Sequence, residues 1–204
     1  MHNINIKRNI YIYVILKKYK RIAQTMVSKI IRFISPEEFE KIYKKCNDKK
    51  LKLAIMLGFG SGLRISEIIG YKRKDGTEVP PLTKDNINLK EHQIKVLSGK
   101  GKKDRITITP PNLKETHLRL LPLKIPRRTL QYQFSQLTKK VLGRKLPFHT
   151  LRHGFGNYQV NILNIPLPMV QQTMGHSRID TTGIYTKANP KQAIDTMWER
   201  MGGK

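Results

Sequence analysis

The chain has 204 residues, a length that suits one ample domain or one domain with an appendage. Forty Lys and Arg residues face 14 Asp and Glu residues, and the formal net charge of +26 at pH 7 favours a polyanionic partner, with nucleic acid first and an anionic membrane surface second. A single cysteine, Cys46, excludes an intrachain disulfide framework and fits a reducing, intracellular setting, and the apolar run at residues 11–16 is too short to cross a bilayer.

Residues 1–33 form a basic amino-terminal segment with eight Lys and Arg residues and neither Asp nor Glu. We interpret it as a helical arm or linker, and a poorly ordered tail is the alternative. A strong helix start follows, in which Ser35 can cap the helix, Pro36 suits its first position and Glu38 completes a capping box. The boundary is therefore expected here, with residues 34–204 forming the main domain.

The next helix is expected at residues 49–59, where apolar side chains on nearly every face predict a buried core helix. Glycines at positions 58, 60 and 62 are expected to break it before another helix begins. Arg64 then lies at a glycine-rich turn before a helix start, where backbone amides favour an anion. Glu67, three residues later, could hold its guanidinium, and a simple surface ion pair is the alternative.

Residues 85–109 change to a period of two, which predicts three short antiparallel strands. Glycines on both sides of Lys100 predict a tight turn between the second and third strands, from which that amine could reach outward. A solvated, charged hairpin tip is the alternative. After a proline-rich connector at residues 110–128, helices are expected at 129–142, 150–163, 169–174 and 190–201.

A histidine, an arginine and a second histidine occur within five residues, as His149, Arg152 and His153. His149 and Arg152 are one helical turn apart and can hydrogen-bond one oxyanion, for which phosphate is the obvious candidate. Three functions remain open for this stretch: a metal site formed by His149 and His153, a plain DNA-binding surface, and phosphoryl transfer with a protein nucleophile. The metal site is disfavoured because no Asp or Glu occurs between Glu115 and Asp180.

Five short motifs together resemble the catalytic domain of the tyrosine recombinases, the phage-type integrases. They occur in the family's order and at its usual spacings, at residues 62–67 (GLRISE), 99–105 (GKGKKDR), 149–153 (HTLRH), 174–176 (MGH) and 181–185 (TTGIY). The resemblance covers roughly residues 34–200. It implies an α+β, mostly α-helical catalytic domain with a small three-stranded antiparallel sheet.

The resemblance also implies a role for each matching residue. Arg64 and Arg152 would bind the non-bridging oxygens of the scissile phosphate and stabilise its pentavalent transition state. Tyr185 would be the nucleophile and would form a 3′-phosphotyrosyl link. Taken alone, a single tyrosine here is more often a core aromatic of a carboxy-terminal helix, and that is the alternative for Tyr185.

The remaining residues of the implied site handle protons and hold the phosphate. Lys100 would protonate the departing 5′-oxygen, His149 would assist proton transfer at the nucleophile, and His176 would hydrogen-bond the phosphate. Glu67 and His153 are expected to support this set. No metal, ATP or other cofactor is implied, because the phosphotyrosyl link stores the bond energy and cationic side chains replace the metal ion.

The resemblance implies double-stranded DNA as the partner, a homo-oligomer (a tetramer) on paired recombination sites, no membrane, and a cytoplasmic, nucleoid-associated location. Most members of the family carry a separate helical core-binding domain before the catalytic one, and residues 1–33 are expected to be a remnant of it or its linker. Two alternatives to a site-specific recombinase are a truncated or degenerate recombinase that only binds DNA, and a type IB topoisomerase.

Overall fold

The computed structural model describes residues 33–72, 76, 78–97, 104–175 and 190–203, and every structural statement below concerns these residues. The described helices are α2 (Pro36–Lys45), α3 (Lys49–Gly60), α4 (Ile65–Ile69), α5 (Glu115–Leu118), α6 (Arg127–Leu142), α7 (His149–Asn157), α8 (Leu167–Met174) and α9 (Pro190–Arg200). A 3-10 turn, η1 (Lys84–Asn86), precedes the sheet, and a π-helical turn, η2 (Tyr158–Ile162), extends α7. None of the described helices is long and apolar enough to span a membrane.

The predicted three-stranded antiparallel sheet is confirmed, with the order β3 (Ile87–Asn88), β4 (Gln93–Val96) and β5 (Arg105–Ile108). Val96 lies opposite Arg105 in its register, so Arg105 occupies the end of the sheet next to the β4–β5 connection. A second, two-stranded antiparallel sheet of β1 (Tyr71–Lys72) and β2 (Glu78–Val79) was not predicted. Its strands have two residues each, too few to give a period in the sequence.

The first two helices start where the sequence predicts them. The Ser35 hydroxyl accepts a hydrogen bond from the backbone N–H of Glu38 at 3.2 Å, and the Glu38 carboxylate accepts one from the backbone N–H of Ser35 at 3.3 Å. This is the predicted capping box. Asp48 caps α3 by accepting a hydrogen bond from the backbone N–H of Leu51 at 2.8 Å. Each cap satisfies amides that the first helical turn leaves without a partner.

The predicted end of this helix within its glycine-rich stretch is confirmed, since α3 continues through Gly58 and ends at Gly60, one residue beyond the expected end. The helix is buried along most of its length, and these small residues let its neighbours approach. A Cβ atom at Gly58 would lie 3.0 Å from the Leu151 side chain on α7, and one at Gly60 would lie 2.8 Å from Pro110. The glycines therefore allow close packing. The helix ends at Gly60, and Ser61 connects it to the turn at Gly62.

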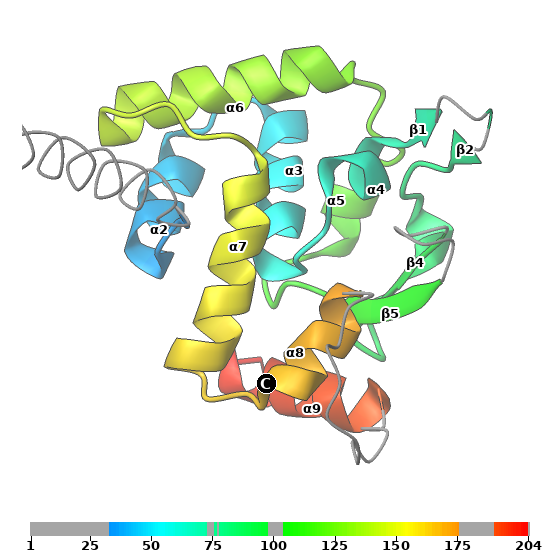
Figure 1. Ribbon diagram of the computed structural model, residues 1–204. Helices are drawn as coiled ribbons and strands as arrows, with labels where there is room; N and C mark the ends of the chain where they lie inside the picture. Colours follow the sequence, from blue (N-terminus) through cyan, green and yellow to red (C-terminus); the bar gives the residue numbers. More distant parts are fainter. Residues whose placement is uncertain (1–32, 73–75, 77, 98–103, 176–189, 204) are drawn as a thin grey trace, which may run out of the picture. The chain divides into compact units, whose positions relative to one another are not determined.

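Helix α7 connects two apolar clusters. The larger cluster surrounds α3 and includes Leu151 of α7. The smaller cluster joins β5, α7, α8 and α9, and its buried members are Ile108, Phe155, Ile165, Val170, Met174, Ile194 and Met197. Figure 1 shows α6 across one end of α3 and α7, and α8 and α9 at the opposite end. Side chains on the middle of α7 consequently lie where the two clusters meet.

Two further boundaries differ from the sequence prediction. The connector at residues 110–128 contains the short helix α5, and α6 begins at Arg127 directly after Pro126. The helix expected at residues 150–163 is α7 followed by η2, in which the hydrogen bonds widen to the π pattern. The helices expected at 169–174 and 190–201 are present as α8 and α9.

Candidate active site

Arg64 stands immediately before α4 and is held by Glu67 in two ways. The backbone N–H of Arg64 donates to Glu67 Oε2 at 2.8 Å, and Nη1 of its guanidinium donates to Glu67 Oε1 at 2.8 Å. The Arg64 side chain is 17% exposed and the Glu67 side chain only 2%. The expected contact is therefore present, and the alternative of a simple surface ion pair is wrong because the carboxylate is buried.

A second arginine, Arg105 of β5, holds the same carboxylate in a bidentate pair. Its Nη1 donates to Glu67 Oε1 at 2.8 Å and its Nη2 donates to Glu67 Oε2 at 2.9 Å. Burial raises the pKa of Glu67, but the hydrogen bonds and charge of Arg105, with those of Arg64, outweigh it and lower the pKa to about 2. Glu67 is thus ionised at neutral pH, and each of its oxygens accepts two hydrogen bonds.

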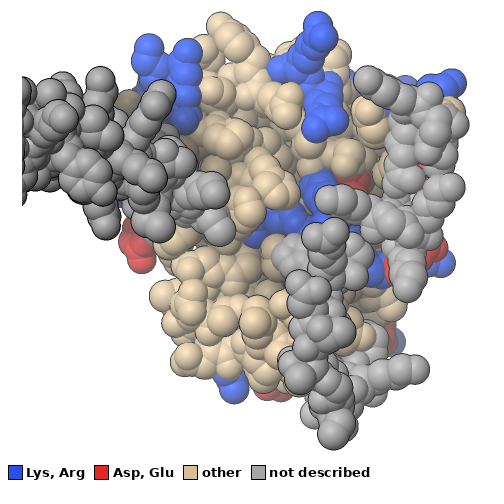
Figure 2. Space-filling model, in the orientation of Figure 1, with Lys and Arg blue, Asp and Glu red and all other residues tan. Residues whose placement is uncertain are grey.

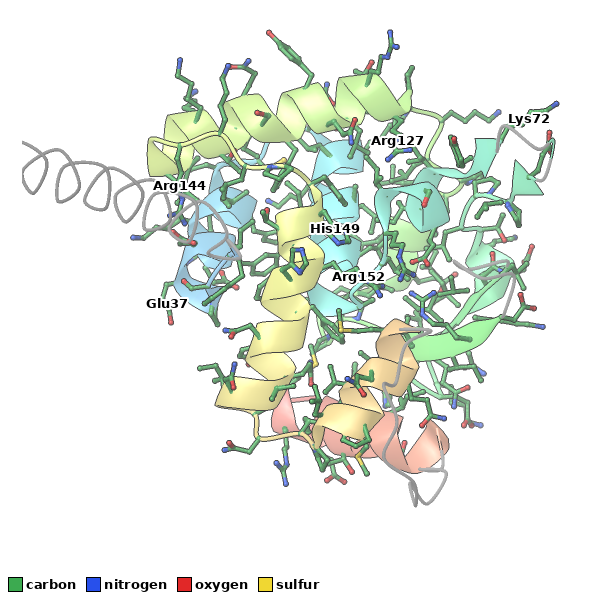
Figure 3. All side chains as sticks on the ribbon, in the orientation of Figure 1. Glu37, Lys72, Arg127, Arg144, His149 and Arg152 are labelled. Carbon is green, nitrogen blue, oxygen red and sulfur yellow. The ribbon has the colours of Figure 1, made fainter. Side chains whose placement is uncertain are left out.

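Arg152 of α7 is buried and donates to two backbone carbonyls. Its Nη1 donates to the Gly62 oxygen at 2.6 Å, and its Nη2 donates to the Met174 oxygen at 2.5 Å. Burial, followed by the charges of Arg64 and Arg105, lowers its pKa to about 9, so the guanidinium stays protonated at neutral pH. Figure 3 shows Arg152 one turn further along α7 than His149.

These contacts close a ring that joins four segments of the chain. Arg152 reaches the turn before α4 through Gly62, and that turn carries Arg64, which is paired with Glu67. Glu67 is paired with Arg105, and Nε of Arg105 donates to the Thr173 oxygen at 2.8 Å. Arg152 and Arg105 therefore bind consecutive carbonyls at the end of α8. We call this set of contacts the arginine ring.

The turn at Gly62 requires glycine. Its φ of +64° lies in the left-handed region, and an added Cβ atom would lie 2.5 Å from the ring of Phe155. Phe155 is a fully buried member of the smaller apolar cluster on α7. The same helix therefore sets the turn by packing, through Phe155, and by hydrogen bonding, through Arg152.

The two histidines of α7 lie at its surface. Their rings are 4.5 Å apart and nearly perpendicular, at 85°. Partial burial and then the charge of Arg152 lower the pKa of His153, which favours its neutral form at neutral pH. His149 and Arg152 share a helix as predicted, but only the imidazole is exposed, since the guanidinium points into the arginine ring.

Comparison with known proteins matches residues 120–192 to the phage integrase family. The chain is 30% identical to the tyrosine recombinase XerA of Pyrococcus furiosus over 177 residues, covering 78% of this chain and 58% of the relative. It is 27% identical to XerA of Pyrococcus horikoshii over 175 residues, covering 78% of this chain and 57% of the relative. This chain belongs to the tyrosine recombinase family. It spans less than two thirds of the length of these curated relatives.

Solved structures support the same tyrosine recombinase fold. The crystal structure of XerA recombinase superposes with a TM-score of 0.54 at 25% identity, covering 82% of this chain and 64% of that one. The integrase from mycobacterium phage Brujita superposes with a TM-score of 0.57 at 21% identity, covering 83% of this chain and 57% of that one. The predicted α+β, mostly helical fold is thereby confirmed.

The structure brings together only part of the tyrosine recombinase residue set. Arg64, Glu67 and Arg152 meet in the arginine ring, and His149 and His153 lie on the same helix as Arg152. Three further predicted residues lie outside the described part of the chain, namely Lys100, His176 and Tyr185. Their roles stay predictions, as does the division of the chain at residue 33.

Sequence reasoning missed Arg105. It belongs to the 99–105 motif but received no role, because its partner Glu67 is 38 residues away and no local pattern connects the two. The strand pattern gave no signal either, because the alternation of Ile106 and Ile108 places Arg105 on the opposite, polar face. In the structure Ile106 is exposed and Thr107, two residues after Arg105, is buried.

Other chemistries find little support among the described residues. No group of three or more His, Cys, Asp or Glu side chains there could hold a metal ion. Cys46 is buried, and burial followed by the charge of Asp48 raises the pKa of its thiol. It is therefore a packing residue between α2 and α3 and a poor nucleophile.

Proposed function

We propose that this chain is the catalytic part of a site-specific DNA recombinase that cleaves and rejoins strands through a 3′-phosphotyrosyl intermediate. The observation that carries the proposal is the arginine ring. It fixes both arginines that the family motifs predict: Arg64 pairs with the buried carboxylate of Glu67, and Arg152 donates to the carbonyl of Gly62, two residues before Arg64. Both belong to motifs far apart in the sequence, and their meeting in one network is what a phosphate site requires.

The charges of the ring favour an anion. The guanidinium groups of Arg64 and Arg105 pair with the carboxylate of Glu67, and that of Arg152 lies close enough to interact with these charges, which leaves a net positive charge. A phosphate gains negative charge on its equatorial oxygens as it becomes pentavalent. Fixed cations that need no rearrangement stabilise that state more than they stabilise the ground state. Figure 2 shows Lys and Arg atoms reaching the surface near the middle of the face it presents.

The proposed reaction is a transesterification. The Tyr185 oxygen attacks the phosphorus, with His149 assisting removal of its proton, while Arg64 and Arg152 hold the non-bridging oxygens. The bond from phosphorus to the 5′-oxygen breaks, and Lys100 gives that oxygen a proton. One phosphodiester is exchanged for another, so no ATP is consumed, and a 5′-hydroxyl reverses the step to join a new strand. His176 is proposed to hydrogen-bond the phosphate.

Double-stranded DNA is the proposed partner. The net charge of +26 provides for many phosphate contacts, whose release of counterions makes binding weaken steeply with salt. A structure of similar fold, the Tn1549 transposon integrase, was determined in complex with circular intermediate DNA, at a TM-score of 0.50 and 19% identity. We extend the proposal to a homo-oligomer, a tetramer on paired sites, working on DNA in the cytoplasm at the nucleoid.

The test is covalent trapping on a suicide DNA substrate, whose nick lets the 5′-fragment diffuse away after cleavage. The wild-type chain is expected to form an adduct that survives denaturant, in excess EDTA as well as without it. Tyr185→Phe is expected to abolish the adduct and leave DNA binding nearly unchanged. The matched control is Tyr132→Phe, which removes the hydroxyl of an exposed tyrosine on α6 and should leave the adduct intact.

Three results would overturn the proposal in different ways. An adduct formed by Tyr185→Phe would assign the nucleophile elsewhere. Loss of cleavage in EDTA that zinc or magnesium restores would revive the metal site at His149 and His153. Tight DNA binding with no adduct from the wild-type chain would leave only the DNA-binding module.

A further inference from the structure

We infer that Arg105 is a positioning residue of the active site, which keeps Arg64 and the end of α8 in their working arrangement. This inference rests on the proposed function. Arg105 is assigned no contact with the substrate, because each of its three guanidinium nitrogens already donates to Glu67 or Thr173. It acts through Glu67, and through Glu67 on Arg64.

The first effect of Arg105 is on the charge of Arg64. Both guanidinium groups donate to the same oxygen, Oε1 of Glu67, at 2.8 Å. The single negative charge of Glu67 is therefore shared, and Arg64 keeps more of its positive charge for a phosphate than it would in an isolated pair. Of the Arg64 side-chain nitrogens, Nη1 is the one with a partner among the described residues, whereas every guanidinium nitrogen of Arg105 has one. This division makes Arg105 the structural arginine and Arg64 the reactive one.

The second effect is on the end of α8. Arg105 holds the Thr173 oxygen and Arg152 holds the next one, that of Met174. Gly175 follows, in the left-handed conformation with φ +65°, and a Cβ atom there would lie 2.6 Å from Cδ of Arg105. The Arg105 side chain therefore passes directly against the residue that precedes His176 in the sequence. Through its hydrogen bonds to Glu67 and to the Thr173 oxygen, Arg105 connects β5 to both α4 and α8.

Arginine is required for this geometry and lysine is not equivalent. The planar fork of a guanidinium binds both carboxylate oxygens while its Nε–H points in a third direction. An ammonium at the end of a flexible stem keeps the charge but cannot make the bidentate pair and the Thr173 contact together. Arg105→Lys thus removes the geometry while retaining the charge.

The experiment compares cleavage with binding on the suicide substrate. Arg105→Lys is expected to slow single-turnover cleavage about 100-fold, the scale for misplacing a catalytic group by about 1 Å, with nearly unchanged DNA affinity. Arg105→Met is expected to slow cleavage further. The matched control is Arg144→Met, which removes an exposed arginine from its pair with Glu38 and should cleave at the wild-type rate. Equal loss of binding and cleavage, or full activity in Arg105→Lys, would overturn the inference.

A second substrate separates positioning of the phosphate site from positioning of the leaving-group acid. With a sulfur at the bridging 5′ position the leaving group needs no proton, so a defect that acts through Lys100 disappears. The Arg105→Lys defect is expected to persist on that substrate, because it acts through Arg64. Its disappearance would assign Arg105 to Lys100 and overturn the inference. In contrast, failure of the proposed function appears as the absence of any adduct from the wild-type chain.

The pH dependence of unfolding tests the inference without any cleavage. It can therefore be measured if the wild-type chain forms no adduct, and for variants too unstable for the cleavage assay. Loss of the bidentate pair is expected to raise the pKa of Glu67, so unfolding of Arg105→Lys should depend less on pH below about pH 5 than unfolding of the wild type. An unchanged pH dependence would show that Arg105 does not hold Glu67 in solution and would overturn the inference. The double variant Glu67→Gln, Arg105→Lys should differ little from either single variant in its cleavage rate and in the pH dependence of its unfolding, because the two residues act as one unit.

Discussion

Two carboxylates of this protein pair with arginine at similar distances and in opposite surroundings. Glu67 and Arg105 have N–O distances of 2.8 and 2.9 Å and side chains that are 2% and 8% exposed. Glu38 and Arg144 have one distance of 2.6 Å and side chains that are 27% and 44% exposed. The exposed pair has the shorter contact, yet it is expected to contribute less to stability, because water and salt screen its charges. Burial, and not distance, separates a positioning device from a surface contact.

The buried pair also concerns the site more than the fold. An apolar cluster of the same volume could fill that space, often with equal or greater stability. What apolar residues could not do is hold Arg64 and the α8 carbonyls in fixed directions. We therefore expect substitutions at Glu67 to affect stability and catalysis together, and substitutions at Arg144 to affect neither strongly.

The largest effect is expected from Glu67→Ala. It leaves Arg64 and Arg105 without their shared anion in a buried place, and removing one partner of a buried ion pair typically costs about 3–5 kcal/mol. Urea unfolding of the wild type and the variant measures the difference. A loss below about 1 kcal/mol would show that water reaches the arginine ring and that the comparison of the two pairs is misplaced.

Acid should reveal the same pair without deleting it. The pKa of Glu67 falls from 4.5 to about 2 on folding, and this difference corresponds to roughly 3 kcal/mol at about 1.4 kcal/mol per pH unit. Because the folded-state pKa is the lower one, the stabilisation is complete above about pH 5 and is lost as the pH falls towards 2. Glu67→Gln lacks this contribution, so its stability should fall less steeply over that window. Parallel curves would contradict the ionised, paired state of Glu67.

The sequence predicted what local chemistry determines. The Ser35 capping box, the alternation behind β3, β4 and β5, and the pairing of Arg64 with Glu67 all involve residues within a few positions of each other. The capping glycine of α8 was also recognisable, since Gly175 follows the last helical residue.

Contacts between distant residues could not be predicted in the same way. The hydrogen bond from Arg152 to the Gly62 oxygen joins residues 90 apart, and the pair of Arg105 with Glu67 joins residues 38 apart. Motif order indicated that Arg64 and Arg152 meet, but only the fold shows that carbonyls hold Arg152. Likewise, the sequence does not show that Gly58 and Gly60 let Leu151 and Pro110 pack closely against α3.

A third carboxylate supplies an intermediate case. Asp48 accepts a hydrogen bond from the backbone N–H of Leu51 at 2.8 Å, at the start of the buried helix α3. Asp48→Ala is expected to cost about 1 kcal/mol, the usual value for a helix cap. Asp48→Asn retains an acceptor and serves as the control, with a smaller loss. A cost as large as that of Glu67→Ala would mean that a neutral partner suffices and that the arginines add nothing.

The smallest effect is expected from the exposed pair, and Arg144→Met is the variant that isolates it. Changing Glu38 would also remove the bond from its carboxylate to the backbone N–H of Ser35, and with it part of the α2 cap, whereas changing Arg144 leaves that cap in place. Exposed ion pairs contribute about 0.2–1 kcal/mol and are screened by salt, so the loss should be small in dilute buffer and vanish in concentrated salt. Urea unfolding of both proteins at low and high salt measures it. The N–O distance of the Arg144 pair is shorter than that of the Arg105 pair. If Arg144→Met lost as much stability as Arg105→Met, and salt did not reduce that loss, contact geometry would outweigh burial in this protein.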